Sequence, residues 1–392
     1  MRIYVPLITL LIILLGFQIV ITKYFKIPTN QPVQTKQQTA EIIRRIAKEI
    51  NDDCHLKDAA CFEKGAREKL LDVYPTHQIL DAIYDYDTYF SCHAFTHFLG
   101  RALYQKTGNI PDSYSQINFT CHGGTYHGVI EAYLAERNST IALINGQEIE
   151  QVCRDSRAKT DKNPEAVFNE CLHGFGHAFM FTTDDELPTS LSYCDKLQAE
   201  LRERCYGGAF MENSTSSTNR DHPSHYLKTD DKFFPCTILE NRYLNQCYFY
   251  QANYLIMSSN HNFQKVYDDC YTLTGNQYKY CIMGIGAILA SVSNETSIEN
   301  AASVCNLAKD TARTICIEGA IPSLMQRYGG EVEKLVKFCD FSPADLKEAC
   351  FAKLGIVSNM WHTPEQVELI CKQAKSYYEF CTGKKTVKLY FN

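Results

Sequence analysis

The sequence predicts an all-α protein: a solenoid of disulfide-linked helical hairpins in units of about 34 residues, behind one N-terminal transmembrane helix. Three observations support this prediction. The 18 cysteines recur at a nearly constant spacing, helix-start signals lie between them, and an uncharged apolar segment opens the chain. A hydrophobic content of 45% and a charged content of 21% are those of an ordinary globular protein.

The apolar segment runs from Ile3 to Thr22 and contains no charged residue. About 20 apolar residues match the thickness of a bilayer core, so residues 1–23 are expected to be a signal-anchor that spans the membrane once. No clear small-residue cleavage site precedes Lys23, although a cleaved signal peptide is the alternative. Residues 24–40 are mainly polar, contain two prolines and are expected to form a stalk.

Cysteine usage indicates the compartment. An even number of cysteines at this density is typical of oxidising compartments, so the body is expected outside the cytoplasm. Four glycosylation sequons are compatible with export, and their asparagines are Asn118, Asn138, Asn213 and Asn294. The net charge of −6, without a long basic run, argues against a nucleic-acid partner, because phosphate binding needs clustered Lys and Arg.

From Cys194 onward the cysteines fall into pairs, most of them 11 positions apart. The pairs are Cys194/Cys205, Cys236/Cys247, Cys270/Cys281, Cys305/Cys316, Cys339/Cys350 and Cys371/Cys381. The second cysteines from Cys247 to Cys350 recur every 34 or 35 residues, the length of a helix–turn–helix repeat. Each pair is therefore expected to be a disulfide that joins the end of one helix to the start of the next.

The same frame extends backward to a Cys153/Cys171 pair with a longer turn. Four cysteines remain and are expected to pair among themselves, in one of three connectivities that the sequence leaves open. They are Cys54, Cys61, Cys92 and Cys121. Metal ligation by cysteine is the weaker interpretation, because no pair has the C-x-x-C spacing of zinc knuckles.

Local signals place two helices in each unit. Ser342-Pro343, Thr363-Pro364 and Thr296-Ser297 each look like a helix start with a capping hydroxyl. Glycine stands three residues after a cysteine at Gly124, Gly174, Gly208, Gly284 and Gly319. Because a helical glycine costs about 1 kcal/mol relative to alanine, its repetition predicts close contact with a neighbouring helix.

On this period and these hairpin disulfides, residues 150–382 resemble Sel1-like and other cysteine-rich tetratricopeptide-type solenoids, although the consensus motifs of those repeats are not met. The resemblance implies a curved stack of helix pairs, often used to bind another protein or a glycan. We divide the body into a histidine-rich half, residues 41–235, and C-terminal repeats, residues 236–382. Residues 383–392 are expected to be a frayed tail.

Half of the 12 histidines lie in three cysteine-led segments of the N-terminal half. They are His93, His97, His122, His127, His173 and His177. The first two and the last two are four positions apart, which puts both rings of each pair on one helix face, as in zinc-binding HExxH helices. We predict that the six bind a divalent metal, with zinc first and copper or iron as alternatives, and that two ions are conceivable.

Register in stacked repeats supports this site. His97, His127 and His177 lie five or six positions after their leading cysteines, so they are expected on one face of helices packed about 8–10 Å apart. Glu131 and Glu212 are the candidate catalytic residues, as proton acceptors in metal-assisted hydrolysis.

Three classes of function stay open. The first is an extracytoplasmic metal-dependent enzyme, a hydrolase more than an oxidoreductase. It is not a zincin, because Ala94 and Gly174 stand where HExxH proteases have glutamate. The second is a metal or haem binder without turnover. The third is a repeat scaffold for a protein or glycan, in which the histidines are structural.

Overall fold

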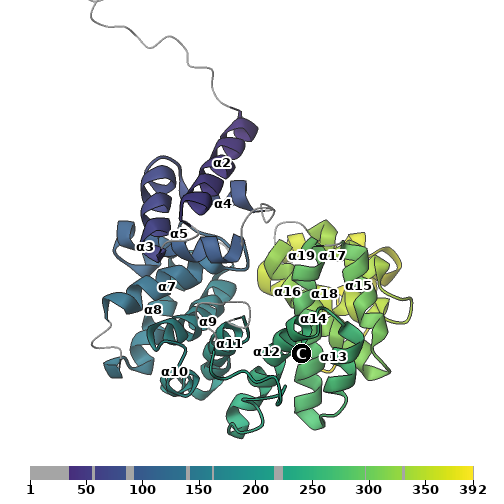
Figure 1. Ribbon diagram of the computed structural model, residues 1–392. Helices are drawn as coiled ribbons and strands as arrows, with labels where there is room; N and C mark the ends of the chain where they lie inside the picture. The colour runs from purple at the N-terminus through teal and green to yellow at the C-terminus, as the bar shows by residue number, and fades with distance from the viewer. Residues whose placement is uncertain are drawn as a thin grey trace, which may run out of the picture. The chain divides into compact units, whose positions relative to one another are not determined.

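The computed structural model describes residues 35–54, 58–84, 92–137, 142–160, 163–215, 224–295, 297–328 and 332–391. Every regular element in these ranges is a helix, as predicted (Figure 1). No helix in them combines the length and apolar character needed to cross a bilayer, and the predicted span at residues 3–22 lies outside the described residues. The first described helix, α2 (Lys36–Cys54), begins inside the segment predicted as a stalk.

Eight helices form what we term the central row, in which each helix packs against the next. They are α5 (Cys92–Thr107), α7 (Gly124–Glu136), α9 (Pro164–Thr182), α11 (Ala199–Thr215), α12 (Asn241–Ser258), α14 (Gly275–Glu295), α16 (Thr311–Tyr328) and α18 (Lys347–Trp361). The other elements precede, separate or follow them: α3 (Ala59–Gly65), η1 (Ala66–Leu71), α4 (Thr76–Ile83), α6 (Ile110–Tyr114), α8 (Gly146–Ala158), α10 (Leu187–Cys194), α13 (Phe263–Cys270), α15 (Ile298–Val304), η4 (Cys305–Leu307), α17 (Val332–Phe341), α19 (Pro364–Gln373), η5 (Lys375–Tyr377) and α20 (Tyr378–Cys381). Some of these also pack on one another, as α6 does on α8 and α15 on α17. The predicted helical-hairpin repeat is therefore present.

All 18 cysteines form disulfides. The six pairs predicted from Cys194 onward are confirmed, and so is Cys153–Cys171. The four cysteines whose pairing was open form Cys54–Cys61 and Cys92–Cys121. A typical hairpin has its first cysteine at the end of one helix and its second in the second turn of the next, as α13 and α14 do. Each such disulfide links two helices across their turn.

Close backbone contact within the central row is confirmed. A Cβ added at Gly208 of α11 would lie 1.9 Å from the carbonyl oxygen of His173 in α9. One added at Gly128 of α7 would lie 2.0 Å from the carbonyl oxygen of His97 in α5. Gly174 differs, because the nearest atom to an added Cβ would be 3.4 Å away. Glycine therefore allows the histidine-bearing helices to pack with their backbones in contact.

The expected helix starts are partly confirmed. Thr363 caps α19 in a capping box, and Ser297 caps α15. The expected start at Ser342 is wrong, because α18 begins only at Lys347. The hydroxyl of Ser342 instead donates to the carbonyl oxygen of Phe338, at 2.9 Å, in the last turns of α17. Ser342 therefore bonds to the C-terminal end of α17 and does not cap the start of α18.

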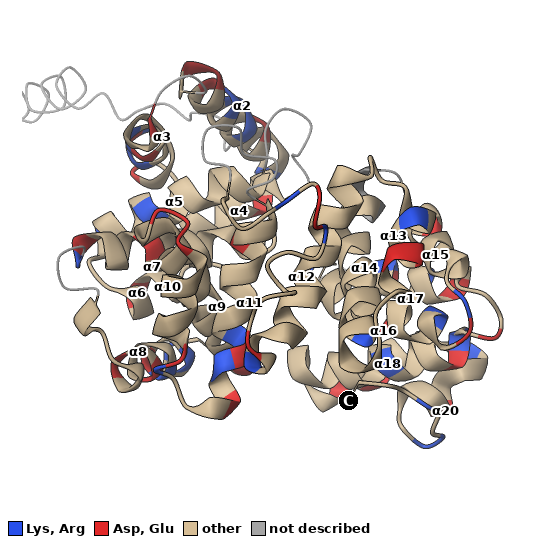
Figure 2. Ribbon diagram, turned by 60° about the horizontal axis from the view of Figure 1, so that its bottom comes forward, with Lys and Arg blue, Asp and Glu red and all other residues tan. Residues whose placement is uncertain are grey.

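The C-terminal repeats contact the histidine-rich half. Helix α18 packs against α9, and Gln326 Nε2 of α16 donates to Glu170 Oε2 of α9 at 3.2 Å. The rings of Phe119 and Trp361 meet with centroids 4.7 Å apart. These contacts bring α16 and α18 next to the helices that carry the histidines. Basic and acidic residues are interspersed along the described chain (Figure 2).

The tail is held in place, so the expectation that it frays is wrong. The backbone N–H groups of Tyr390 and Phe391 both donate to the carboxylate of Glu318, at 2.7 Å each. Lys353 Nζ donates to the carbonyl oxygen of Phe391 at 2.8 Å. Glu318 and Lys353 are buried side chains of the central row, and the chain end supplies their hydrogen-bond partners.

Candidate metal centre

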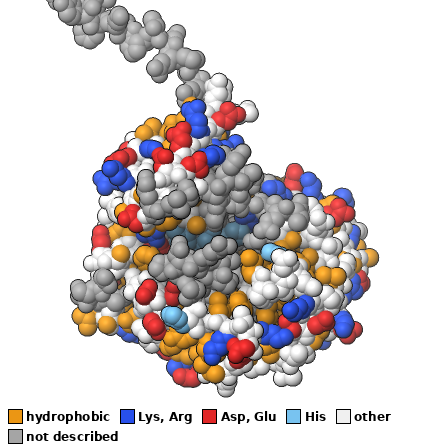
Figure 3. Space-filling view, in the orientation of Figure 1, with side chains coloured by type: hydrophobic (Ala, Val, Ile, Leu, Met, Phe, Trp, Pro, Cys, Tyr) orange, Lys and Arg blue, Asp and Glu red, His pale blue; other side chains and the backbone are white. Residues whose placement is uncertain are grey.

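Five of the six predicted histidines meet between three adjacent helices of the central row. Helix α5 supplies His93 and His97, α7 supplies His127, and α9 supplies His173 and His177. The ring centroids of His97 and His127 are 5.2 Å apart, and those of His127 and His177 are 4.1 Å apart. Histidine side chains are visible in a recess of the face shown in Figure 3. The register of the repeats thus brings these rings together, as expected.

The first histidine pair is held with its Nε2 atoms facing each other. His93 Nδ1 donates to the carbonyl oxygen of Cys121 at 2.8 Å, and His97 Nδ1 donates to Glu131 Oε1 at 2.6 Å. A neutral imidazole that donates through Nδ1 has a lone pair on Nε2, so both Nε2 atoms are acceptors when both rings are in this form. They lie 3.1 Å apart. Two lone pairs cannot hydrogen-bond to each other, but both can bind the same cation.

The second pair repeats the geometry of the first. His177 Nδ1 lies 2.7 Å from Glu212 Oε2, and His173 forms a hydrogen bond to the backbone of Arg204. The Nε2 atoms of His173 and His177 are again 3.1 Å apart. In each pair, one ring is fixed by a backbone group and the other by a glutamate of the next central-row helix.

His127 lies between the two pairs. Its Nε2 is 2.8 Å from Glu170 Oε1, whereas its Nδ1 is buried without a hydrogen-bond partner in the described part of the chain. His127 forms one group of potential ligands with the first pair and another with the second. Within each group the ligand nitrogens lie within 4.8 Å of one another. The five rings therefore offer two three-histidine groups that share His127.

Burial makes these histidines weak bases. Burial, reinforced by the neighbouring His97, lowers the pKa of both His93 and His177 to about 3. Burial also holds the pKa values of His127 and His173 well below the usual 6.5. These four rings are therefore neutral at physiological pH, which is the form in which imidazole binds a metal.

Three glutamates contact the rings: Glu131 and Glu212 at the Nδ1 atoms of His97 and His177, and Glu170 at Nε2 of His127. Burial by itself raises the pKa of Glu131, but the neighbouring His97 and Arg101 lower it by more. The net pKa is below the usual value, so the carboxylate stays ionised. Its two oxygens are both engaged, one by His97 and the other by Arg101. Burial raises the pKa of Glu170 to about 8 and also raises that of Glu212. Glu212 binds His177 through Oε2 alone, and 35% of its side chain is exposed.

His122 is the one predicted ligand that joins neither three-histidine group. It belongs to a turn before α7 in which Cys121, His122 and Gly123 have φ angles of 56°, 55° and 74°. Helical spacing therefore does not apply to it. Its Nε2 is buried and has no partner within the described ranges. Burial, together with the nearby charges of Arg327 and His93, lowers its pKa to about 3.

Sequence reasoning missed three residues that support the centre: Arg101, Glu170 and Gln326. Arg101 stands four positions after His97 on α5, so a search for i,i+4 partners beyond histidine would have found it. Glu170 lies one turn before His173 on α9, but the other histidine-bearing segments have no glutamate at the same spacing, so no repeated pattern points to it. Gln326 is 156 positions from Glu170, and no local signal predicts their contact.

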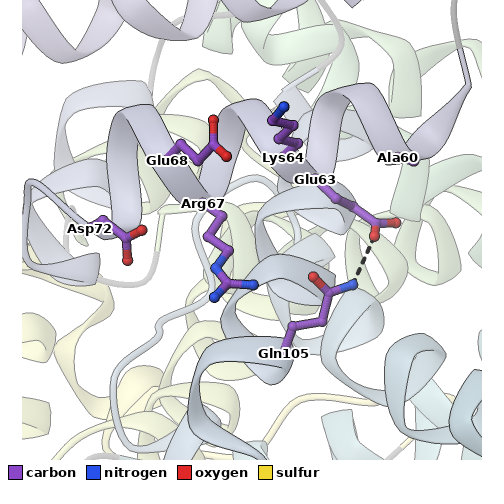
Figure 4. A pocket seen from close by; sticks show the side chains of 7 residues that line it. All are labelled: Ala60, Glu63, Lys64, Arg67, Glu68, Asp72 and Gln105. Carbon is purple, nitrogen blue, oxygen red and sulfur yellow. Dashed lines mark hydrogen bonds between the residues drawn. The ribbon is translucent and has the colours of Figure 1, made fainter.

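A groove of about 520 Å³ lies elsewhere, on the elements that precede α5 and on α5 itself. It is lined by Ala60, Glu63, Lys64, Arg67, Glu68, Asp72 and Gln105 (Figure 4). Glu63 accepts hydrogen bonds from Gln105 and from Arg101, whose guanidinium also binds Glu131. The groove is thus linked to the centre through Arg101, but its mixed charges define no ligand class.

The sequence matches no protein-family model, and no curated protein is significantly similar to it. The donor atoms themselves must therefore indicate what the centre can bind. Both groups consist of histidine alone. Imidazole nitrogen suits zinc, copper, iron and nickel rather than magnesium or calcium, which prefer oxygen ligands.

Proposed function

We propose that the chain is a membrane-anchored metalloenzyme whose five-histidine centre binds a divalent transition-metal ion, with His127 completing one three-histidine group at a time. The observation that carries this proposal is the pair of facing Nε2 atoms, 3.1 Å apart, at both ends of the centre. Tetrahedral zinc, with bonds of about 2.0–2.1 Å, holds neighbouring ligand nitrogens about 3.3 Å apart. The rings therefore need little movement to bind an ion.

A purely structural role explains this arrangement less well. Structural histidines usually satisfy both ring nitrogens, because a buried polar atom without a partner costs about 1–3 kcal/mol. Among the described residues, His127 Nδ1 is such an atom, and the facing Nε2 atoms of His93 and His97 have no proton to share when both rings are neutral and donate through Nδ1. A bound cation would satisfy all three nitrogens.

The chemistry follows from the three-histidine groups. Three histidines with a further open position are an arrangement found in catalytic zinc sites. Such an ion lowers the pKa of a bound water to about 7 and so supplies a nucleophile for hydrolysis. Glu131 and Glu212 hold His97 and His177 in the orientation that presents Nε2. Glu212 is the better candidate proton acceptor, because its second oxygen is free of His177 and its side chain is partly exposed.

Oxygen or electron chemistry is the second candidate, and the donor set is suited to it too. All-imidazole coordination suits copper and iron as well as zinc. Tyr250 of α12 lies beside His173, with ring centroids 6.2 Å apart, and places an oxidisable side chain next to the centre. The identity of the bound metal separates the two candidates.

Residues 3–22 are the proposed membrane anchor, with the body outside the cytoplasm. The complete pairing of 18 cysteines supports an oxidising compartment. Glycosylation at Asn213 is disfavoured, because this side chain is buried and its Oδ1 accepts a hydrogen bond from Ser224 at 2.5 Å.

Elemental analysis tests the proposal. The full chain would be produced in an oxidising compartment and compared with a variant carrying His93→Ala, His127→Ala and His173→Ala. A matched control replaces three exposed histidines, His77, His225 and His261. We expect zinc, copper or iron in the wild type and the control, but not in the first variant. A wild-type protein that takes up no metal, even after reconstitution, would exclude the proposed function.

If zinc is found, hydrolysis of ester, amide and phosphoester substrates should be lost with the metal. Glu212→Gln should then lower the rate while the metal content stays unchanged. If copper or iron is found, oxidation assays take the place of hydrolysis.

A further inference from the structure

Arg327 of α16 is a buried arginine to which the described part of the chain supplies no counter-ion. Arg327 is 7% exposed. Within the described ranges, its Nε has no hydrogen-bond partner and no carboxylate pairs with its guanidinium. Arg101 is similarly buried, but its charge is paired, because the carboxylates of Glu63 and Glu131 both bind its guanidinium. Arg327 departs from that pattern.

An unpaired buried charge is costly. The guanidinium cannot lose its proton at physiological pH, so Arg327 cannot avoid the cost by becoming neutral as a lysine might. Buried charges in folded proteins are therefore paired or bind ions. A position that holds a buried arginine without a carboxylate is suited to an anion from solution.

Arg327 lies beside the histidine centre. Its neighbour Gln326 binds Glu170, which in turn binds His127. Arg327 is near enough to His122 for its charge to lower the pKa of that imidazole, and Nε2 of His122 is a second buried polar atom without a partner among the described residues. Two unsatisfied groups, one cationic and one able to donate an N–H, thus stand next to the candidate metal ligands.

We propose that Arg327 and His122 form an oxyanion-binding subsite next to the histidine centre, and that the substrate carries a carboxylate or phosphate group bound there. Arg327 can hold either group through two parallel N–H bonds. The role of this group as part of a substrate rests on the proposed function, whereas binding of the anion requires no metal.

The binding test uses the metal-free full chain. Inorganic phosphate and, separately, acetate would be titrated by calorimetry at constant ionic strength. We expect saturable binding of at least one, and the stronger of the two identifies the substrate group. Arg327→Gln should weaken binding at least tenfold, while Arg137→Gln, at an arginine paired with Glu148 away from the centre, should leave it unchanged. Absence of binding, or equal binding by Arg327→Gln, overturns the proposal.

Thermal unfolding separates a ligand-binding arginine from a structural one. Without added anion, Arg327→Met should unfold a few degrees higher than the wild type, because an uncompensated buried charge is removed. Phosphate or acetate should stabilise only the wild type. A lower unfolding temperature for Arg327→Met would show that Arg327 is structural and refute the subsite. Loss of anion binding in Arg327→Gln together with a negative metal analysis would refute only the proposed function.

Discussion

His127 and His177 stack with ring centroids 4.1 Å apart and planes at 18°, which joins the two halves of the histidine centre. His127 is also the ring that both three-histidine groups contain. The other four histidines each belong to one group. The centre is therefore best understood as two similar ends with a common middle, and the middle residue should affect both ends.

Single substitutions should show this shared role. We expect the wild type to retain about one ion per chain after dialysis and His127→Ala to retain almost none, because each group then keeps only two of its three ligands. His93→Ala and His173→Ala should each retain about one ion, since each leaves the opposite group complete. Elemental analysis per folded chain measures the result. His225→Ala, at an exposed histidine, is the control, and full retention by His127→Ala would rule out a shared ligand.

Two glycines at equivalent positions should respond differently to alanine. Gly208 and Gly174 both stand three residues after a cysteine of the central row. A Cβ at Gly208 would lie 1.9 Å from the carbonyl oxygen of His173, so Gly208→Ala must push α11 away from α9. We expect it to destabilise the chain by about 3 kcal/mol or more.

Gly174→Ala has only an ordinary contact at 3.4 Å and gains helix propensity. Its free energy of unfolding should stay the same or rise by about 0.5–1 kcal/mol. Urea unfolding of both variants under oxidising conditions checks the pair. Similar losses of stability in the two would contradict close packing as the cause.

The sequence predicted the features that depend on spacing along the chain. Seven disulfides followed from the repeat period, and His97, His127 and His177 met because equal offsets in stacked repeats fall on one face. His122 joins neither three-histidine group, and helical counting does not apply to it because three residues of left-handed backbone precede α7 there.

The residues that complete the site escaped prediction for a physical reason. Gln326 and Arg327 reach the histidines only because the C-terminal repeats pack against α9, and a nearest-neighbour repeat model contains no such contact. The tail was likewise expected to fray on composition alone. Its docking depends on Glu318 and Lys353, which are buried charges in distant helices that no local pattern connects to the chain end.

The metal-free protein should lose stability as the pH falls below 6.5. Five histidines have lowered pKa values in the folded chain: His93, His122, His127, His173 and His177. Unfolded chains bind protons at these residues near pH 6.5, but the folded chain does so only near pH 3 or below, so acid favours unfolding. Each histidine can contribute up to about 1.4 kcal/mol per pH unit in this window.

Two carboxyl groups partly oppose this effect. Glu170 and Glu212 have raised pKa values, so between about pH 4.5 and the folded pKa the folded chain holds their protons and the unfolded chain does not. Five histidines against two carboxyl groups still leave the unfolded state with more bound protons. Urea unfolding of chelator-treated protein from pH 7 to pH 5 measures the slope. A free energy of unfolding that is constant or rises toward pH 5 would contradict the neutral, buried state of the histidines.

The docked tail gives the last prediction. Deleting residues 386–392 removes the backbone groups that bind Glu318 and Lys353, and leaves two buried charges without these hydrogen bonds. A buried polar group left unsatisfied costs about 1–3 kcal/mol, so we expect the truncated chain to unfold at lower urea concentration. Glu318→Gln with Lys353→Met should recover much of that loss in the truncated chain, because it removes the buried charges, yet should destabilise the full chain. Lys384→Ala, at an exposed tail residue, is the control. Equal stability of the full and truncated chains would mean that the tail contacts contribute nothing. If the double substitution changed the free energy of unfolding by the same amount in the full and the truncated chain, the tail and the two charges would not be coupled.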